Sequence, residues 1–312
     1  MSGQTEIPQK SSAARVEVAA RAFYALPAPA KLNLFLHVTG RRADGMHLLE
    51  SHFILIDLAD LLDFEVLKTA EIVRTGDTVG DPEKDLCVRA ARLLQEVSLS
   101  RTGKTPGARI HVVKNIPAGA GLGGGSSDAA LTLMALNRLW GLDLTRDELI
   151  ELGAKLGADI PFFIFGRDAF AAGIGEQLTP LAVPDALWVV AMPSTPTSTA
   201  AVFADPALTR NTKSLKISAL SEKLLHQWPQ LAGRNDLEEA ACRINPDIAR
   251  ARSILGEGAR MTGSGSAVFA WCRDEDQARR KIALLPPDIR GYAVRSLHEH
   301  PAARLLESRP RA

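Results

Sequence analysis

The most informative segment of the chain is a glycine-rich run, Pro117-Ala118-Gly119-Ala120-Gly121-Leu122-Gly123-Gly124-Gly125-Ser126-Ser127. It joins a predicted strand, residues 109–114, to a predicted helix, residues 126–140. Glycine tolerates a positive φ and lets a ligand approach the backbone without an intervening Cβ atom. The helix that follows presents unpaired N–H groups and its positive dipole end to an anion. The run therefore predicts a phosphate-binding loop rather than a merely flexible turn.

The helix after this loop has clear boundary signals. Ser126 or Ser127 can cap its first turn, and Asp128 suits the positive end of its dipole. Gly141 is expected to end it. Its apolar face is formed by residues at helical spacing, Ala129, Leu133, Leu136 and Trp140.

The type of phosphate loop narrows the function. No Gly-Lys-Ser/Thr closes the run, so it is not a Walker A loop. Gly119, Gly121 and Gly124 satisfy GxGxxG, which keeps an NAD-dependent oxidoreductase as an alternative of a different class. However, that fold expects an acidic residue at the end of the next strand. Here Asp143 follows the helix directly, so the dinucleotide interpretation ranks lower.

The segments before the loop predict a hairpin and a helix. Residues 31–38 alternate, with Leu32, Leu34, Leu36 and Val38 on one face, which predicts a strand with one buried face. The Asp44-Gly45 turn and a second strand at 47–58 complete the hairpin. A further strand is expected at 64–73 and a helix at 85–97.

The segments after the loop continue the alternation of helices and strands. Thr145 and Glu148 form a capping-box pattern for a helix at 146–155, and an aromatic strand is expected at 162–165 after Pro161. The proline-containing stretch 180–184 is the predicted domain boundary. Beyond it we expect a strand at 187–192, a loop at 193–199, helices near 218–227 and 236–242, a strand at 266–272, a helix from Glu275 and a strand at 292–297.

This order of elements predicts a mixed α/β or α+β chain. At 312 residues, the length suits two domains. We place a loose extension at 1–24, one domain at 25–183 and a second at 184–312.

Composition excludes several classes of protein. The chain has 37 Lys+Arg against 36 Asp+Glu, so it has no bulk basic field for nucleic acid or an anionic membrane surface. Its three cysteines, Cys87, Cys242 and Cys272, form no CxxC pair, which argues against a disulfide framework or structural zinc. No membrane span or secretory signal is recognised, and a cytoplasmic location is expected. The oligomeric state is not predicted.

The glycine-rich run resembles the ATP-phosphate loop of the GHMP kinase superfamily. Other motifs occur in the order seen in the branch of that superfamily that acts on a cytidine-diphosphate-linked methylerythritol: Ala28-Pro-Ala-Lys31-Leu-Asn33-Leu, Arg42-Ala-Asp44-Gly45-Met46-His47, Leu156-Gly157-Ala158-Asp159-Ile-Pro161, Asn235-Asp236-Leu-Glu238 and Met261-Thr262-Gly263-Ser264-Gly265-Ser266. The similarity covers about residues 27–294.

The resemblance implies a fold and a reaction. The fold would be a two-domain GHMP kinase fold, with an N-terminal ribosomal-protein-S5-like domain that binds ATP and a C-terminal ferredoxin-like domain. The reaction would be ATP-dependent phosphorylation of the 2-hydroxyl of 4-diphosphocytidyl-2-C-methyl-D-erythritol, a step of the non-mevalonate isoprenoid pathway. Mg2+ would accompany ATP, with ligands that the sequence does not identify beyond the possibility of Ser127.

The resemblance also assigns roles to single residues. Lys31 and Asp159 would be catalytic, with Asp159 as general base. Asn33 and His47 would contact the substrate, and Phe203 would face its cytosine ring. The residues from Pro117 to Ser127 would bind ATP.

Two further alternatives stay open at this stage. The first is a GHMP kinase with another small acceptor, such as homoserine, mevalonate or a sugar. The second is a non-enzymatic nucleotide-binding regulator on a kinase scaffold, against which Lys31 and Asp159 argue.

Overall fold

The computed structural model describes residues 22–81, 84–229 and 231–307. Most of the predicted extension, residues 1–21, lies outside this part, and Ala22–Tyr24 already belong to a strand. The elements are, in order, β1 (Ala22–Arg41), β2 (His47–Leu67), β3 (Ile72–Gly76), α1 (Leu86–Thr102), β4 (Gly107–Val113), α2 (Gly124–Trp140), α3 (Arg146–Ala154), α4 (Ile160–Phe165), β5 (Ala169–Ala172), β6 (Gln177–Pro180), β7 (Leu187–Pro193), α5 (Thr199–Ala204), α6 (Ile217–Gln227), α7 (Glu238–Ile244), α8 (Pro246–Leu255), β8 (Arg260–Met261), β9 (Val268–Cys272), α9 (Glu275–Ala283), β10 (Ile289–Leu297) and a 3-10 turn, Ala303–Leu306.

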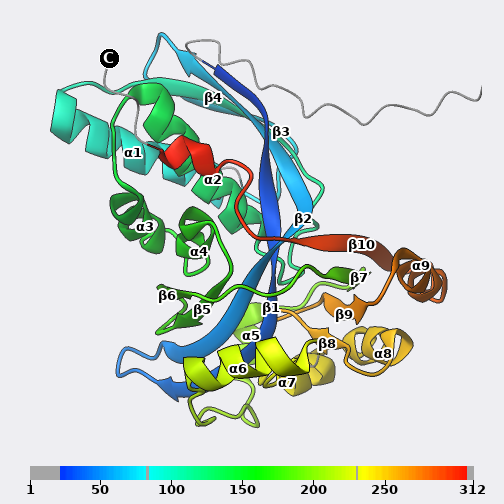
Figure 1. Ribbon diagram of the computed structural model, residues 1–312. Coiled ribbons are helices and arrows are strands. Elements are labelled where there is room, and N and C mark those ends of the chain that lie inside the picture. Colours follow the sequence, from blue (N-terminus) through cyan, green and yellow to red (C-terminus); the bar gives the residue numbers. More distant parts are fainter. Residues whose placement is uncertain (1–21, 82–83, 230, 308–312) are drawn as a thin grey trace, which may run out of the picture.

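Two long antiparallel strands, β1 and β2, run through both halves of the molecule (Figure 1). The predicted Asp44-Gly45 turn joins them, and Gly45 has φ +88°, a conformation that favours glycine. The prediction of one buried face for residues 31–38 is wrong, because all eight residues are buried, so both faces of the strand are covered there. Helices cover the strand on one side, and elements of the second half cover it on the other.

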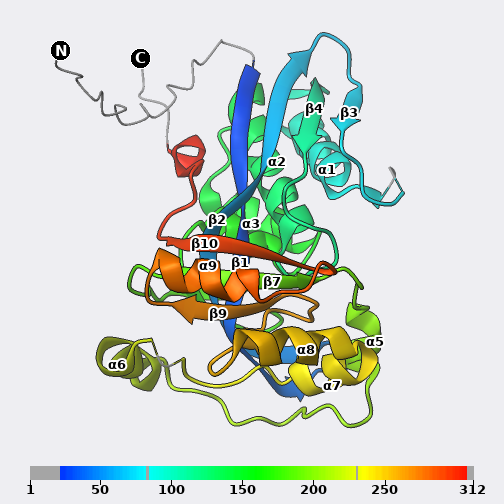
Figure 2. The same cartoon turned by 90° about the vertical axis from the view of Figure 1, so that its right-hand side faces the viewer.

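The last strand connects the two halves of the sheet. The strand order is β3-β4-β2-β10-β7-β9-β8, and β1 pairs with β2. β10 pairs antiparallel with β7 along its length, and its final residues Ser296 and Leu297 pair with Ile56 and Leu55 of β2 (Figure 2). The C-terminal strand thereby holds the two halves in a defined orientation.

Three apolar clusters form the core. Helices α1 to α4 lie on one side of the long strands (Figure 1), where α2 packs on β1 and β2. A second cluster lies between the long strands and one face of β7 and β9, around Trp188 and Phe269. Helices α8 and α9 cover the other face, where Val189 is buried. Trp188 and Val189 belong to different clusters because neighbouring residues of a strand face opposite sides of the sheet. The order of helices and strands confirms the predicted mixed α and β architecture.

The segment after Asp159 differs from its prediction. The predicted strand at 162–165 is wrong, because Ile160–Phe165 form helix α4, with Pro161 in its first turn and Gly166 in the left-handed conformation after it. Proline lacks an N–H group and has a helical φ, so it is favourable at the start of a helix. The continuous apolar run reflects burial on all sides rather than a strand.

Several other elements also differ from their predictions. The predicted strand at 64–73 is divided, because β2 ends at Leu67 and β3 begins at Ile72. Helix α2 begins at Gly124, and no serine side chain caps it. Helices α5 and α8 were not predicted, whereas the capping box of Thr145 and Glu148 is confirmed. None of the described helices is long and apolar enough to cross a membrane.

A buried histidine links β2 to the segment after β6. The ring of His52 is 1% exposed, and its Nε2 donates a hydrogen bond to the Leu181 carbonyl oxygen at 2.7 Å. Burial lowers the pKa of His52 to about 4, although the bond to Leu181 acts in the opposite direction. The native protein therefore holds this imidazole neutral at pH values where an unfolded chain protonates it.

We expect His52→Gln to weaken the acid sensitivity of the fold. A depressed native pKa contributes stability above the unfolded value of 6.5, and this stability is lost as the pH falls towards about 4. Glutamine can keep the bond to Leu181 but does not titrate. Between pH 7 and 4, the decrease in unfolding free energy should be smaller in the variant by up to about 3 kcal/mol, measured by urea denaturation. The exposed His226→Gln is the control, and equal pH dependence in all three proteins would contradict the assignment.

Candidate active site

The glycine-rich loop has the backbone geometry of an anion site. Gly119, Gly121 and Gly123 have φ of +70°, +76° and +75°. Gly123 precedes α2, whose N-terminus has no side-chain cap, so the first N–H groups of this helix remain available to a ligand. All the predicted loop residues line one cavity except Ser127, which is buried beneath it.

Asp60 of β2 fixes the segment that leads into the glycine loop. The sequence did not predict this role. One oxygen of its buried carboxylate accepts hydrogen bonds from the N–H groups of Asn115 (2.6 Å) and Ile116 (2.8 Å). The other oxygen accepts from Lys114 Nζ. The available signal was an acidic residue within a strand that is otherwise rich in apolar residues.

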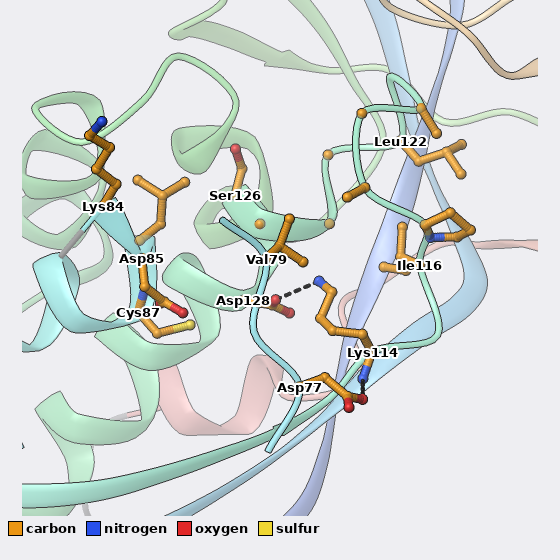
Figure 3. Close-up of a pocket in the computed structure, with 18 of the residues that line it drawn as sticks. Asp77, Val79, Lys84, Asp85, Cys87, Lys114, Ile116, Leu122, Ser126 and Asp128 are labelled. Atoms are coloured by element: carbon orange, nitrogen blue, oxygen red, sulfur yellow. Dashed lines mark hydrogen bonds and ion pairs between the residues drawn. The ribbon is translucent and has the colours of Figure 1, made fainter. Parts of the chain in front are cut away.

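The cavity beside the loop has a volume of about 370 Å³ and balanced charges. Lys114 lies between Asp60 and Asp128, and Figure 3 shows its ammonium group directed at Asp128, 2.8 Å away. Arg74 pairs with Asp85 at 3.1 Å. Because these cations are already neutralised, the backbone N–H groups of the loop are the main groups in this cavity that remain available to an anion.

Two of the acids that line this cavity, Asp128 and Asp85, differ in their surroundings. Burial, aided by the charge of Asp60 and opposed by Lys114, raises the pKa of Asp128 to about 7. Asp85 caps α1 by accepting hydrogen bonds from the N–H groups of Cys87 and Val88. With its other oxygen bound to Arg74, Asp85 acts as a wall of the cavity.

A second cavity, about 320 Å³, lies on the other side of the loop. Gly119, Gly121, Gly123 and Ser126 line both cavities, so the loop is their common wall. Four residues predicted from the sequence meet in the second cavity: Lys31, Asn33, Asp159 and Phe203. A phosphate group held by the loop would thus face a molecule bound in the second cavity.

Lys31 and Asp159 form an ion pair in this second cavity. Lys31 Nζ is 3.5 Å from Asp159 Oδ2, and the Lys31 side chain is 4% exposed while that of Asp159 is 35% exposed. The ammonium group also donates to Asn33 Oδ1 at 2.6 Å and lies 4.9 Å from the centre of the Phe53 ring. Lys31 is therefore held rigidly, while the carboxylate of Asp159 remains open to the cavity.

The side chain of Asn33 is itself oriented by its neighbours. Its amide nitrogen donates to Ser51 Oγ at 2.9 Å, and its oxygen accepts from the Thr262 hydroxyl at 3.2 Å. Thr262 lies in a second glycine-containing loop, residues 262–266. This loop approaches the first so closely that a Cβ atom on Gly121 would lie 2.4 Å from the Thr262 carbonyl oxygen. The two loops and β1 therefore form one packed unit.

His47 and Phe203 lie together rather than on two sides of a gap. Their rings stack with centres 4.9 Å apart and an angle of 30° between the planes. Phe203 lines the second cavity, and His47 is not among its lining residues. No group of three His, Cys, Asp or Glu side chains that could hold a metal ion occurs in the part of the chain that the structure describes.

Comparisons with known proteins agree with this geometry. The family model "GHMP kinases N terminal domain" matches residues 85–167, and "GHMP kinases C terminal" matches residues 217–284. A protein of Janthinobacterium sp. (strain Marseille), named 4-diphosphocytidyl-2-C-methyl-D-erythritol kinase, is 50% identical over 90% of this chain and 97% of its own length. The chain therefore belongs to the GHMP kinases and, within them, to the family of the 4-diphosphocytidyl-2-C-methyl-D-erythritol kinases.

Solved structures place the fold in the same superfamily. A crystal structure titled 4-(cytidine 5'-diphospho)-2C-methyl-D-erythritol kinase matches with a TM-score of 0.73 and 36% identity, over 86% of this chain and 98% of that one. A homoserine kinase from Cytophaga hutchinsonii, at 15% identity, a TM-score of 0.64 and 94% and 98% coverage, shares the fold. The predicted GHMP kinase fold is confirmed, and this GHMP kinase is an ATP-dependent small-molecule kinase.

Gly123→Ala tests the wall between the two cavities. A Cβ atom at this position would lie 2.9 Å from the Phe163 ring and 3.2 Å from Lys31 Cγ. We expect kcat to fall about a hundredfold, because a displaced Lys31 no longer faces the loop. The control is Gly258→Ala, at φ +80° with nothing within 4 Å of the added atom. Both variants should lose about 1–2 kcal/mol of stability from the positive φ. Equal kcat in the two variants would show that close packing at Gly123 is irrelevant.

Proposed function

We propose that this kinase transfers the γ-phosphate of ATP to the 2-hydroxyl of 4-diphosphocytidyl-2-C-methyl-D-erythritol. The observation that carries the proposal is the wall that the two cavities share. The glycine loop, which resembles the nucleotide-binding loop of the family, lines one cavity on one side and the cavity with Lys31 and Asp159 on the other. The names of relatives that are about half identical to this chain support this choice of acceptor. The homoserine and mevalonate kinases, at 15% and 17% identity, support only the common fold.

The catalytic pair follows from this arrangement. The acceptor hydroxyl lies between Lys31 and Asp159, and Asp159 takes its proton as the oxygen forms a bond to the γ-phosphorus. The bond between that phosphorus and the bridging oxygen breaks, and the electron pair leaves with ADP. Lys31 offsets the charge that develops on the oxygens. Phosphoryl transfer depends mainly on positioning, which the rigid contacts of Lys31 provide.

The donor set beside the loop fits Mg2+. Ser127 Oγ and Asp128 Oδ1 are buried oxygens without a hydrogen-bond partner among the described residues. Mg2+ prefers oxygen ligands and commonly binds through one or two carboxylates together with substrate phosphates. We propose that Asp128 and Ser127 hold the ion, which when bound neutralises phosphate charge.

The remaining assignments belong to the same proposal. Asn33 orients Lys31 and lines the acceptor cavity, Phe203 forms its aromatic end, and the His47 ring, which is not part of the lining, stacks on Phe203 beside the substrate site. The domains are 25–183 and 184–312. The three cysteines are free, which is compatible with a reducing compartment, so we propose a cytoplasmic location.

Asp159→Asn tests the general base. Asparagine keeps the size of the side chain but cannot accept the proton, so kcat should fall by about 10²- to 10⁴-fold. The nucleotide lies on the other side of the loop, so affinity for a non-hydrolysable ATP analogue should stay within about twofold of the native value in calorimetry. Asp276→Asn, an exposed residue on α9, is the control and should keep native turnover.

Two results would contradict the assignment. Native turnover by Asp159→Asn would exclude this carboxylate as the base. Efficient phosphorylation of mevalonate or homoserine by the native protein, without phosphorylation of the cytidyl acceptor, would overturn the proposed substrate.

A further inference from the structure

Thr262 joins the second half of the chain to the strand that carries Lys31. It lies between β8 and β9 and is fully buried. Thr262 Oγ1 accepts a hydrogen bond from the Asn33 N–H group at 2.9 Å and donates one to Asn33 Oδ1 at 3.2 Å. One hydroxyl group therefore contacts both the backbone and the side chain of Asn33.

The direction of each hydrogen bond around Asn33 follows from the groups involved. The Phe35 carbonyl oxygen can only accept, so Ser51 donates its single hydroxyl proton to it, at 2.6 Å. The Ser51 oxygen then accepts from Asn33 Nδ2, at 2.9 Å. Asn33 Oδ1 consequently faces two donors, the Lys31 ammonium group and the Thr262 hydroxyl group. Both lone pairs of this oxygen are used inside the protein.

The Asn33 amide in turn determines the position of the Lys31 ammonium group. Lys31 Nζ lies 2.6 Å from Asn33 Oδ1 but 3.5 Å from Asp159 Oδ2. An ammonium group has three N–H donors, so the bond to Asn33 leaves donors for the acceptor cavity, which Lys31 lines. If the amide turned, the ammonium group would lose the shorter of these two contacts.

The contact between the two glycine loops does not need the Thr262 hydroxyl group. The N–H group of Ala267 donates to the Ala120 carbonyl oxygen at 3.1 Å, which joins the loops through the backbone. Asn235 Nδ2 also holds the second loop, since it donates to the carbonyl oxygens of Met261 (2.9 Å) and Gly263 (2.8 Å). Within the described part of the chain, the Thr262 hydroxyl group bonds to Asn33 alone.

We propose that Thr262 is a positioning residue for phosphoryl transfer, because its hydroxyl group fixes the Asn33 amide and thereby directs the Lys31 ammonium group towards the acceptor cavity. The proposal rests on the proposed function and adds that the second half of the chain completes the catalytic geometry of the first. Without the hydroxyl group, Asn33 Oδ1 loses a donor and the buried Asn33 N–H group loses its acceptor, so the amide can turn. The displaced charge of Lys31 then slows the transfer more than it weakens binding of ATP.

Two substitutions of Thr262 separate its hydroxyl group from its methyl group. Thr262→Val keeps the shape of the side chain but loses the hydroxyl group, so kcat should fall about tenfold to a hundredfold, with KM for ATP within about twofold of the native value. Thr262→Ser keeps the hydroxyl group, and its kcat should stay within about threefold of the native value. These rates are measured with ATP and the cytidyl acceptor.

Thr212→Val is the matched control. It removes another threonine hydrogen bond of the second half, from the Thr212 hydroxyl group to Asp236 Oδ2 at 2.6 Å, and should keep native kcat. Urea denaturation of all three variants shows whether any loss of activity reflects unfolding.

A double-mutant cycle tests whether Thr262 acts through Asn33. Asn33→Ala removes the amide, so the further change Thr262→Val should lower kcat by less than about threefold. Two effects that multiply in full would contradict the proposal, because each residue would then act by itself.

The mobility of the Lys31 ammonium group gives a readout that does not depend on the acceptor. Side-chain nitrogen NMR relaxation in the nucleotide-free protein reports how rigidly each ammonium group is held, and Lys31→Gln identifies the signal. We expect the order parameter of Lys31 Nζ to fall about twofold in Thr262→Val. It should keep its native value in Thr262→Ser and Thr212→Val.

Several outcomes would overturn the proposal. An unchanged Lys31 order parameter in Thr262→Val would do so, and so would native kcat in that variant. A Thr262→Ser protein that loses as much activity as Thr262→Val would also do so, since the methyl group rather than the hydroxyl group would then matter. If the native protein does not phosphorylate the cytidyl acceptor, the proposed function fails, whereas the order parameter still decides whether Thr262 positions Lys31.

Discussion

Both cavities depend on the close approach of the glycine loop to strand β1. Gly123 has no Cβ atom, so the Phe163 ring and the stem of Lys31 pack directly against the backbone there. The N–H group of Lys31 donates to the Leu122 carbonyl oxygen at 3.0 Å, which joins the loop to the strand. The same short segment of backbone thus forms the wall of the cavity beside the loop and supports Lys31, the proposed catalytic lysine. Movement of this wall would alter both sites together.

The charged side chains of the site are paired with one another over short distances. The whole chain has nearly equal numbers of acidic and basic residues, and the cavity beside the loop repeats this balance, with Lys114 held between Asp60 and Asp128. Backbone N–H groups at the start of α2 remain for the phosphates. The side chain of Lys31 is the exception, because its partner Asp159 is partly open to the acceptor cavity. The positive charge of Lys31 is thereby placed in the acceptor cavity, where the proposed phosphoryl transfer would occur.

Local signals predicted those parts of the fold that short segments control by themselves. The Asp44-Gly45 turn and the capping box of Thr145 need only their own neighbours, and both occur as expected. Residues 160–165 were misassigned because a short apolar run is compatible with a buried strand and a buried helix alike. Pro161 in the first turn and Gly166 at the end favoured the helix, and packing among buried residues removed the amphipathic pattern.

The sequence by itself determined the family, and it singled out the glycine loop and the lysine and aspartate that the structure pairs, because these depend on residue types in a short, ordered pattern. Only the tertiary structure decided that Asp60 holds the segment before the loop and that the Thr262 hydroxyl bonds to Asn33, 229 positions away in the chain. Such contacts depend on the pairing of distant strands and on which side of each strand faces a cavity. A single sequence does not record these properties, since they follow from how the whole chain packs.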